Sequence, residues 1–173
     1  MHKTSAWPLA LIYAALIVFA SLFPFDGWRS QGMDPSVFFL AHIPPPYWTW
    51  FDVNINIAGY APFGFLLALA LLRTGWTRSA VPVAFLAGTL PSFTMEFTQI
   101  YLPRRVSSNM DLVLNAAGTL AGALVAAALE WLGAIARWSR FRERWFVPQA
   151  RGALVLMALW PVALLFPASV PLG

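Results

Sequence analysis

Five long stretches of this sequence carry almost no charge, and they constrain the fold more than any other feature. They cover residues 7–25, 55–72, 80–102, 112–132 and 152–172, and the acids within them are Glu96 and Glu130. A bilayer core about 30 Å thick needs roughly 20 apolar residues of helix. Backbone groups in lipid must also pair with one another. The sequence therefore predicts an all-α integral membrane protein with about five transmembrane helices in one bundle.

The composition excludes most soluble classes of protein. Of the 173 residues, 60% are hydrophobic and 10% are charged, whereas soluble domains carry about 45–50% and about 25%. The basic residues lie in short clusters between the apolar stretches, which argues against a nucleic-acid partner. Cysteine is absent, and His2 and His42 lie far from Glu96 in sequence. We expect a single membrane domain over residues 1–173, surrounded by membrane lipids, with no metal and no cofactor.

The loops predict the direction of the helices, because cytoplasmic loops are rich in Lys and Arg. One side holds eight of the 11 basic residues: Lys3, Arg73, Arg78, Arg137, Arg140, Arg142, Arg144 and Arg151. The other side holds Arg29, Arg104 and Arg105. We therefore expect a cytoplasmic N-terminus and an outer C-terminus. Since the last span ends at Leu172 without a polar flank, either the C-terminus lies at the outer surface or the chain is the N-terminal part of a longer one.

Two loops combine aromatic residues with proline or arginine. In the outer loop, Trp48 and Trp50 follow three consecutive prolines, a composition that suits contact with lipid headgroups. An aromatic ligand platform is the alternative. In the inner stretch 137–151, arginines alternate with aromatic residues. This pattern is typical of a basic helix that lies on an anionic leaflet and anchors the chain.

Several polar residues fall at one depth of the predicted bundle. The helix over 80–102 runs outward and the helix over 112–132 runs back, so their polar residues meet beneath the outer surface. A charged group at the centre of a span costs on the order of 3 kcal/mol, so such groups often mark a site. The predicted polar cluster comprises Asn56, Glu96, Gln99, Arg105, Asp111 and Asn115. In this hypothesis Glu96 is the central acid, Arg105 contacts an anion, and Arg104 contacts headgroups with Trp48 and Trp50.

Each of these residues also has a structural explanation. Asp111 can cap a helix, Asn115 can bond between helices, and a Glu96–Arg105 pair can pin a hairpin. The spacing of Gly118 and Gly122 favours close helix packing, and Pro62 with Gly64 predicts a kink. The occurrence of all six polar residues at one depth favours a site.

The order of these residues resembles the VanZ-like family. The segment 56–64 (Asn-Ile-Ala-Gly-Tyr-Ala-Pro-Phe-Gly) is similar to its helix-two signature, and Leu22–Phe25 also fits. A second signature is similar in order and spacing to Glu96, Gln99, Pro103, Arg105, Asp111, Asn115 and Gly118. The resemblance covers roughly residues 10–130. The family often has glycine where this chain has Arg104 and an acid where it has Ser108, which puts in doubt any chemistry that needs a second acid.

The resemblance implies a multi-pass protein of the bacterial cytoplasmic (inner) membrane, in a family linked to resistance to teicoplanin, a lipid-tailed glycopeptide. The first functional hypothesis is a non-enzymatic envelope protein that binds an amphiphile, such as a lipid-linked cell-wall precursor or a lipoglycopeptide. An alternative is an intramembrane enzyme that acts on an envelope lipid with Glu96 as its acid or base, the best catalytic candidate. A further alternative is a small transporter subunit, for which five helices would require a homo-oligomer.

Overall fold

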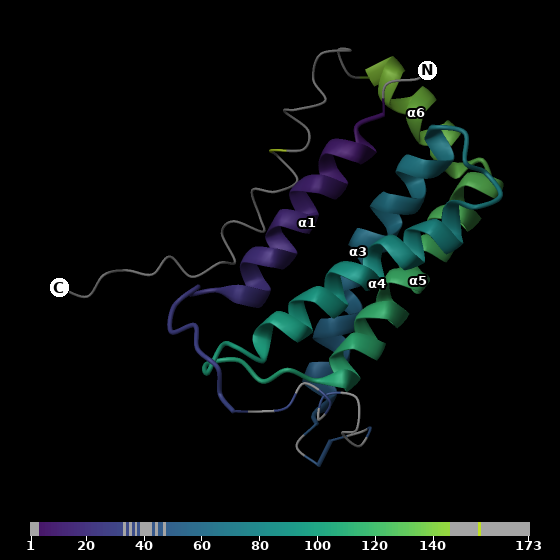
Figure 1. Ribbon diagram of the computed structural model, residues 1–173. Helices are drawn as coiled ribbons and strands as arrows, with labels where there is room; N and C mark the ends of the chain where they lie inside the picture. Colours follow the sequence, from purple (N-terminus) through teal and green to yellow (C-terminus); the bar gives the residue numbers. More distant parts are fainter. Residues whose placement is uncertain are drawn as a thin grey trace. The chain divides into compact units, whose positions relative to one another are not determined.

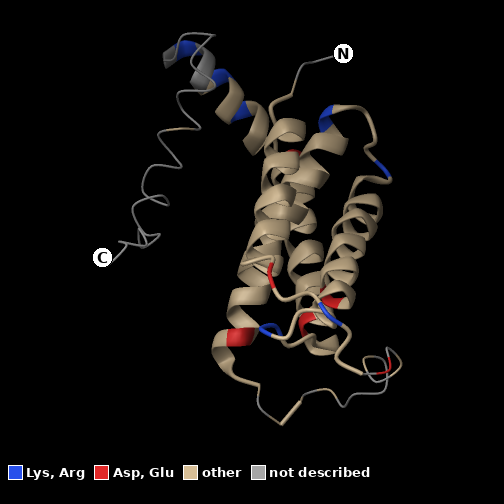
Figure 2. Ribbon diagram, turned by 60° about the vertical axis from the view of Figure 1, so that its left-hand side comes forward, with Lys and Arg blue, Asp and Glu red and all other residues tan. Residues whose placement is uncertain are grey.

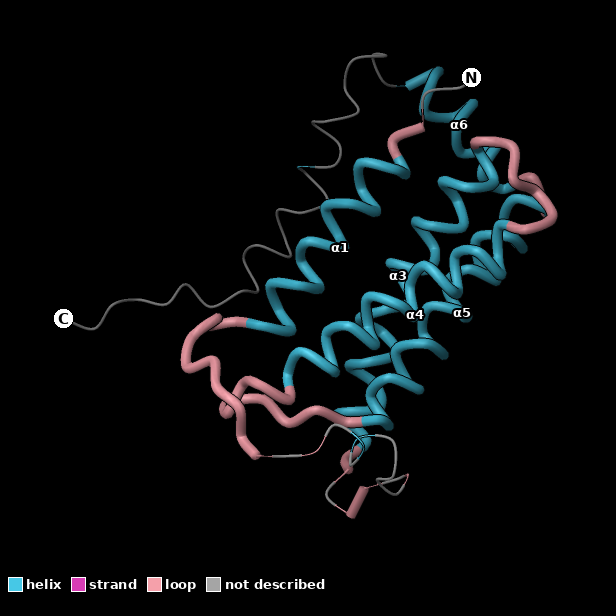
Figure 3. The backbone as a smooth tube through the Cα atoms, in the orientation of Figure 1, coloured by secondary structure: helices cyan, strands magenta, loops and turns pink. Residues whose placement is uncertain are grey.

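The computed structural model describes residues 4–32 and 48–145, together with the single positions 34, 36, 38, 43, 45, 46 and 156. In this part of the chain, every long element is a helix and no strand occurs (Figures 1 and 3). The helices are α1 (Ala6–Leu22), α3 (Trp50–Arg73), α4 (Ala80–Gln99), α5 (Asn109–Trp131) and α6 (Ala134–Trp145). The first four belong to one compact unit that ends at Leu132, and α6 belongs to a second unit. The prediction of an all-helical protein is confirmed.

Three of the helices are long and apolar enough to cross a bilayer: α3, α4 and α5. The 17 residues of α1 form a shorter apolar helix, which at 1.5 Å per residue spans about 25 Å. These helices identify a membrane protein, as predicted. The fifth predicted span, over 152–172, lies outside the described residues except for Leu156. The count of five spans and the direction of the chain across the membrane stay predictions.

The ends of the helices differ from the predicted limits because capping residues decide them. The second helix begins at Trp50 rather than Ile55, since Thr49 and Asp52 form a reciprocal capping box. Asp52 and Asn54, which precede the predicted span 55–72, therefore lie in the first turns of α3. Similarly, the Ser108 hydroxyl caps α5 and makes it begin at Asn109 rather than Leu112.

Three C-terminal limits fall earlier than predicted, while α1 begins one residue earlier, at Ala6, and α3 ends one residue later, at Arg73. Helix α1 ends at Leu22 rather than Phe25, because a residue before proline, here Phe23, avoids the helical conformation. Helix α4 ends at Gln99 rather than Leu102, and α5 ends at Trp131 rather than Leu132. Four predicted spans therefore exist as helices; α4 begins at the predicted residue, and the other ends are moved by one to five residues.

Glycines bring α3 and α5 into close contact. A methyl group added at Gly64 would overlap the backbone of Thr119 in α5. One added at Gly118 or Gly122 would overlap the backbone of α3. Without a hydrophobic driving force between helices in lipid, such close backbone approach supplies much of the packing. The predicted role of Gly118 and Gly122 in helix packing is confirmed.

The outward faces of the bundle are apolar and its interior contains small and polar residues. Large apolar side chains are exposed along α1, α4 and α5, among them Leu11, Leu16, Leu86, Leu90, Leu124 and Val125. Ser92 and Thr119, by contrast, are fully buried. In water such faces would form large apolar patches, whereas in a bilayer they contact lipid tails. This distribution agrees with the membrane assignment.

Pro62 lies inside α3 and is followed by no break in the helix. One turn earlier in the sequence, the Gly59 carbonyl accepts a hydrogen bond from the Tyr13 hydroxyl at 2.8 Å. The Tyr13 ring also stacks near Phe63, with centroids 6.3 Å apart. These contacts fasten α1 to α3 beside the proline.

Candidate functional site

The four helices of the bundle alternate in direction, so each end of the bundle combines the starts of two helices with the ends of the other two (Figure 1). Helices α1 and α4 finish at the same end at which α3 and α5 begin. We call this the Glu96 end, and the opposite one, which contains Arg73 and Glu130, the Glu130 end. Acidic residues gather at the Glu96 end (Figure 2). The candidate site is built from the polar side chains of this end.

Glu96 connects α4 to the start of α5. Its side chain is 5% exposed, and its Oε2 accepts a hydrogen bond from the Ser108 backbone N–H at 2.8 Å. The Ser108 hydroxyl in turn accepts from the Asp111 N–H at 3.3 Å. A buried N–H that is left without an acceptor costs stability. The Glu96 carboxylate therefore holds the residue that caps α5.

A second group of polar residues lies deeper between the helices. Asn115 of α5 donates from Nδ2 to the Ser92 hydroxyl of α4 at 2.9 Å, and Ser92 also interacts with the Tyr60 hydroxyl of α3. The Thr119 hydroxyl donates to the Asn115 carbonyl at 2.9 Å. Asn115 is 4% exposed, and its Oδ1 is buried without a hydrogen-bond partner among the described residues.

We call Tyr60, Ser92, Glu96, Ser108 and Asn115 the polar layer. It joins α3, α4 and α5 through side chains that are all at most 9% exposed. Ser92 lies four residues before Glu96, and Asp111 lies four residues before Asn115, so each pair shares a helix face. The layer can satisfy hydroxyl or amide donors through the carboxylate of Glu96 and the free Asn115 Oδ1.

Gln99 and Arg105 do not join the polar layer, although both were predicted to. Gln99 donates from Nε2 to the Ser21 carbonyl at 2.9 Å. Arg105 donates from Nη2 to the carbonyls of Ala20 and Phe23, both at 2.8 Å. These are the terminal carbonyls of α1, which have no partner within that helix and carry partial negative charge. Among the described residues, Arg105 forms no ion pair with an acid, so the Glu96–Arg105 pair that could pin the hairpin is not observed.

Asp111 and Asn56 lie at the edge of the polar layer. Asp111 is half-buried and close enough to Glu96 and Asp52 for their carboxylates to repel one another. Asn56 donates from Nδ2 to the Asp52 carbonyl at 2.9 Å, a bond within its own helix. Among the described residues, no three His, Cys, Asp or Glu side chains are arranged to hold a metal ion. The carboxylates of Glu96, Asp111 and Asp52 therefore make the Glu96 end rich in hydrogen-bond acceptors.

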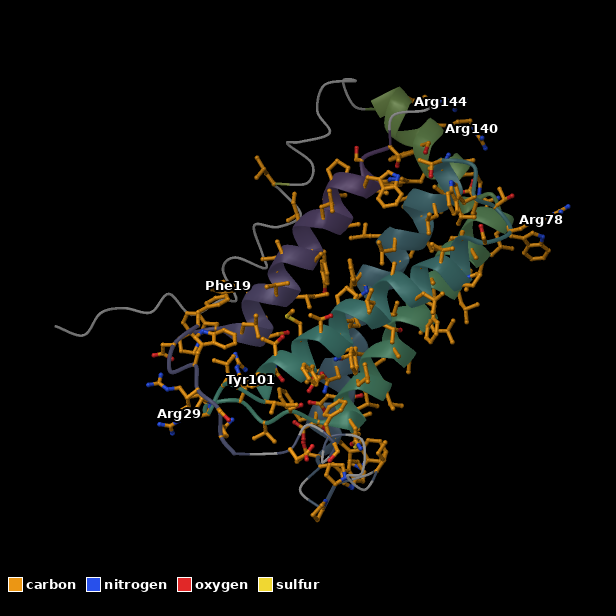
Figure 4. All side chains as sticks on the ribbon, in the orientation of Figure 1. Phe19, Arg29, Arg78, Tyr101, Arg140 and Arg144 are labelled. Carbon is orange, nitrogen blue, oxygen red and sulfur yellow. The ribbon has the colours of Figure 1, made fainter. Side chains whose placement is uncertain are left out.

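Basic and aromatic side chains lie on the surface at the same end. Arg104 is exposed, with Nη1 3.7 Å from Asp26 Oδ2, a surface ion pair of little energetic weight. Arg29 points outward, and its backbone N–H donates to the Tyr101 carbonyl at 3.1 Å (Figure 4). The rings of Trp48 and Trp50 meet edge to face, with centroids 5.3 Å apart. Both tryptophans lie at the start of α3, next to the capping box.

Sequence reasoning missed three members of the polar layer: Tyr60, Ser92 and Ser108. A serine in an apolar helix often bonds to its own backbone, so the type of residue alone carried little information about Ser92. Two signals were nevertheless present. Ser92 precedes Glu96 by one turn, and the sequence Ser108-Asn109-Met110-Asp111 has the spacing of a helix cap.

Comparison with known proteins gives one match. The model of the VanZ/LLP1 family matches residues 7–130, a range that includes α3 and α4 and nearly all of α1 and α5. No curated protein and no solved structure matches the chain significantly. The matched range contains the whole polar layer and excludes α6. Since the family match covers well over half of the chain, this membrane protein belongs to the VanZ/LLP1 family.

Proposed function

We propose that this chain is a non-enzymatic envelope protein that binds the polar head of an amphiphile at the Glu96 end. The proposed ligand is a lipid-linked cell-wall precursor or a lipoglycopeptide such as teicoplanin. The observation that carries this proposal is the polar layer itself, in which Asn115 Oδ1 has no hydrogen-bond partner among the described residues. A buried acceptor of this kind is costly unless a donor reaches it. Sugar hydroxyls and amides of a cell-wall precursor are such donors.

The geometry modifies the hypothesis that was based on sequence. Arg105 donates to the carbonyls of α1, so we assign contact with ligand phosphate or carboxylate to the exposed Arg104 instead. Trp50, 71% exposed, supplies an amphipathic ring at the depth where headgroups meet acyl chains. The proposed ligand therefore places its lipid tail beside the helices, its anionic group at Arg104 and its donor groups toward the polar layer.

The proposal also requires an orientation and a location. We propose that the protein lies in the bacterial cytoplasmic membrane with the Glu96 end outside. Arg73 and Arg78 lie at or beyond the Glu130 end of α3, where the positive-inside rule puts the cytoplasm. Cell-wall precursors and glycopeptides act on the outer side of this membrane, so the polar layer would face its ligand.

Binding to the purified full-length chain in lipid nanodiscs tests this proposal. We expect teicoplanin to bind more tightly than vancomycin, a glycopeptide without a lipid tail. Replacing Trp50 and Arg104 together by alanine should raise the Kd for teicoplanin about tenfold, which corresponds to ~1.4 kcal/mol. The matched control is Trp76→Ala with Arg78→Ala, an exposed tryptophan and arginine in the loop after α3, which should leave the Kd unchanged. Equal Kd values for the two double variants would contradict the proposal.

A further inference from the structure

Helix α6 lies outside the residues matched by the family and has a pattern of its own. It covers Ala134–Trp145, whereas the family match ends at residue 130. Three arginines are exposed along it, at positions 137, 140 and 144. Spacings of three and four residues place side chains on one face of a helix. The arginines therefore form a continuous basic stripe.

An aromatic pair runs beside this basic stripe. Trp138 is 59% exposed and Phe141 is 48% exposed, and their rings stack with centroids 5.7 Å apart and planes at 25°. Each ring follows an arginine by one residue, which corresponds to a rotation of about 100° around the helix axis. Large aromatic rings beside a row of arginines are typical of helices that lie flat in a membrane interface.

The connection to α5 keeps α6 near the bilayer. Helix α5 has the length and hydropathy of a membrane span and ends at Trp131. Leu132 and Gly133 are the residues between the two helices, and Gly133 has a φ of 67°. This left-handed conformation ends a helix and is readily adopted by glycine. Helix α6 therefore begins within three residues of the end of the candidate span.

We infer that α6 binds an anionic lipid leaflet, with Trp138 and Phe141 in the boundary between headgroups and acyl chains and the basic stripe on lipid phosphates. Charge complementarity selects this partner, because guanidinium groups form paired hydrogen bonds with phosphate. Arginines within a few ångströms of a negatively charged leaflet are also attracted to it electrostatically. This inference does not depend on the function of the polar layer.

Spin labels on the full-length chain test the inference, and the absence of cysteine from the sequence makes single labelling simple. Ala134→Cys places a label on the aromatic side of α6, four residues before Trp138. Ala136→Cys places an otherwise matched label on roughly the opposite side. Each protein is reconstituted into nanodiscs of phosphatidylcholine alone or mixed with phosphatidylglycerol. Accessibility to oxygen and to a water-soluble nickel complex then reports the depth of each label.

In the anionic membrane, we expect the oxygen-to-nickel accessibility ratio at position 134 to rise about threefold, while the label at 136 stays in water. Changing all three arginines of the basic stripe to glutamine should remove this rise. The control Arg78→Gln, in the loop between α3 and α4, should preserve it. An unchanged ratio at 134 would overturn the inference. So would immobilisation of both labels regardless of lipid charge, because α6 would then be docked on protein.

Discussion

Replacing Gly122 by alanine is expected to cause the largest loss of stability of any single methyl group added to this bundle. The new Cβ would overlap the carbonyl oxygen of Ala61 and the backbone nitrogen of Phe65 in α3. Backbone atoms cannot rotate away as a side chain can, so α3 and α5 must separate. Overpacking of this kind costs about 3 kcal/mol. Thermal unfolding in detergent, followed by circular dichroism, should show a marked fall in Tm.

Gly59→Ala is the matched control for this prediction. Gly59 also lies in α3, but an added Cβ would meet no atom within 4 Å. Alanine is a better helix former than glycine by about 1 kcal/mol in peptides, so Tm should stay constant or rise slightly. If the two variants unfolded at the same temperature, the close contact of α3 with α5 would be wrong.

Arg105→Ala is expected to have the second-largest effect, because it removes the hydrogen bonds that Arg105 donates to the end of α1. The carbonyls of Ala20 and Phe23 would lose a charged donor. Hydrogen bonds to charged groups contribute about 1.5–3 kcal/mol each, and the solvent exposure of these two bonds lowers their contribution. We therefore expect the free energy of unfolding to fall by about 2 kcal/mol. Amide hydrogen exchange near residue 20 should also accelerate, since the end of α1 would be released.

The adjacent arginine provides the control for this change. Arg104 is 71% exposed at its side chain and pairs with Asp26 across 3.7 Å. Exposed pairs contribute little, so Arg104→Ala should leave both Tm and exchange at α1 unchanged. Equal destabilisation by the two substitutions would show that Arg105 has no special role in holding α1.

The apolar stretches were sufficient to predict α1, α3, α4 and α5, and local signals explain the starts of α3 and α5 and the end of α1 in retrospect. The length of a stretch without charge is a property of the sequence alone, so α3, α4 and α5 could be expected near their true positions. Their exact first residues depend on side-chain caps. The spacing of a helix cap occurs in Thr49 with Asp52 and in Ser108 with Asp111. A hydropathy pattern does not detect this spacing.

The depth of the candidate site in the bundle was predictable from the sequence, whereas several of its side-chain contacts were not. The alternating direction of the helices correctly brought Glu96 and Asp111 to the same end of the bundle. The partner of Arg105 was not predictable, because it depends on where the last turn of α1 lies relative to the loop between α4 and α5. That placement is a tertiary feature with no local signal. Asn56 likewise bonds to its own helix, an option that spacing alone cannot exclude.

We propose that the polar layer binds a ligand and is more than a structural feature of the bundle. The inhibitory concentration of teicoplanin tests this proposal in a susceptible Gram-positive host. The host expresses the unaltered chain, the Glu96→Gln variant or the Glu130→Gln variant at matched membrane levels. Glutamine at position 96 keeps an oxygen that can accept from Ser108, so the helix cap is preserved while the charge is lost. Glu130 is the matched acid at the Glu130 end, where its Oε2 lies 3.7 Å from Arg73 Nη2. We predict that the unaltered chain and Glu130→Gln raise the inhibitory concentration and that Glu96→Gln does not. Equal inhibitory concentrations for the unaltered chain and Glu96→Gln would contradict the claim.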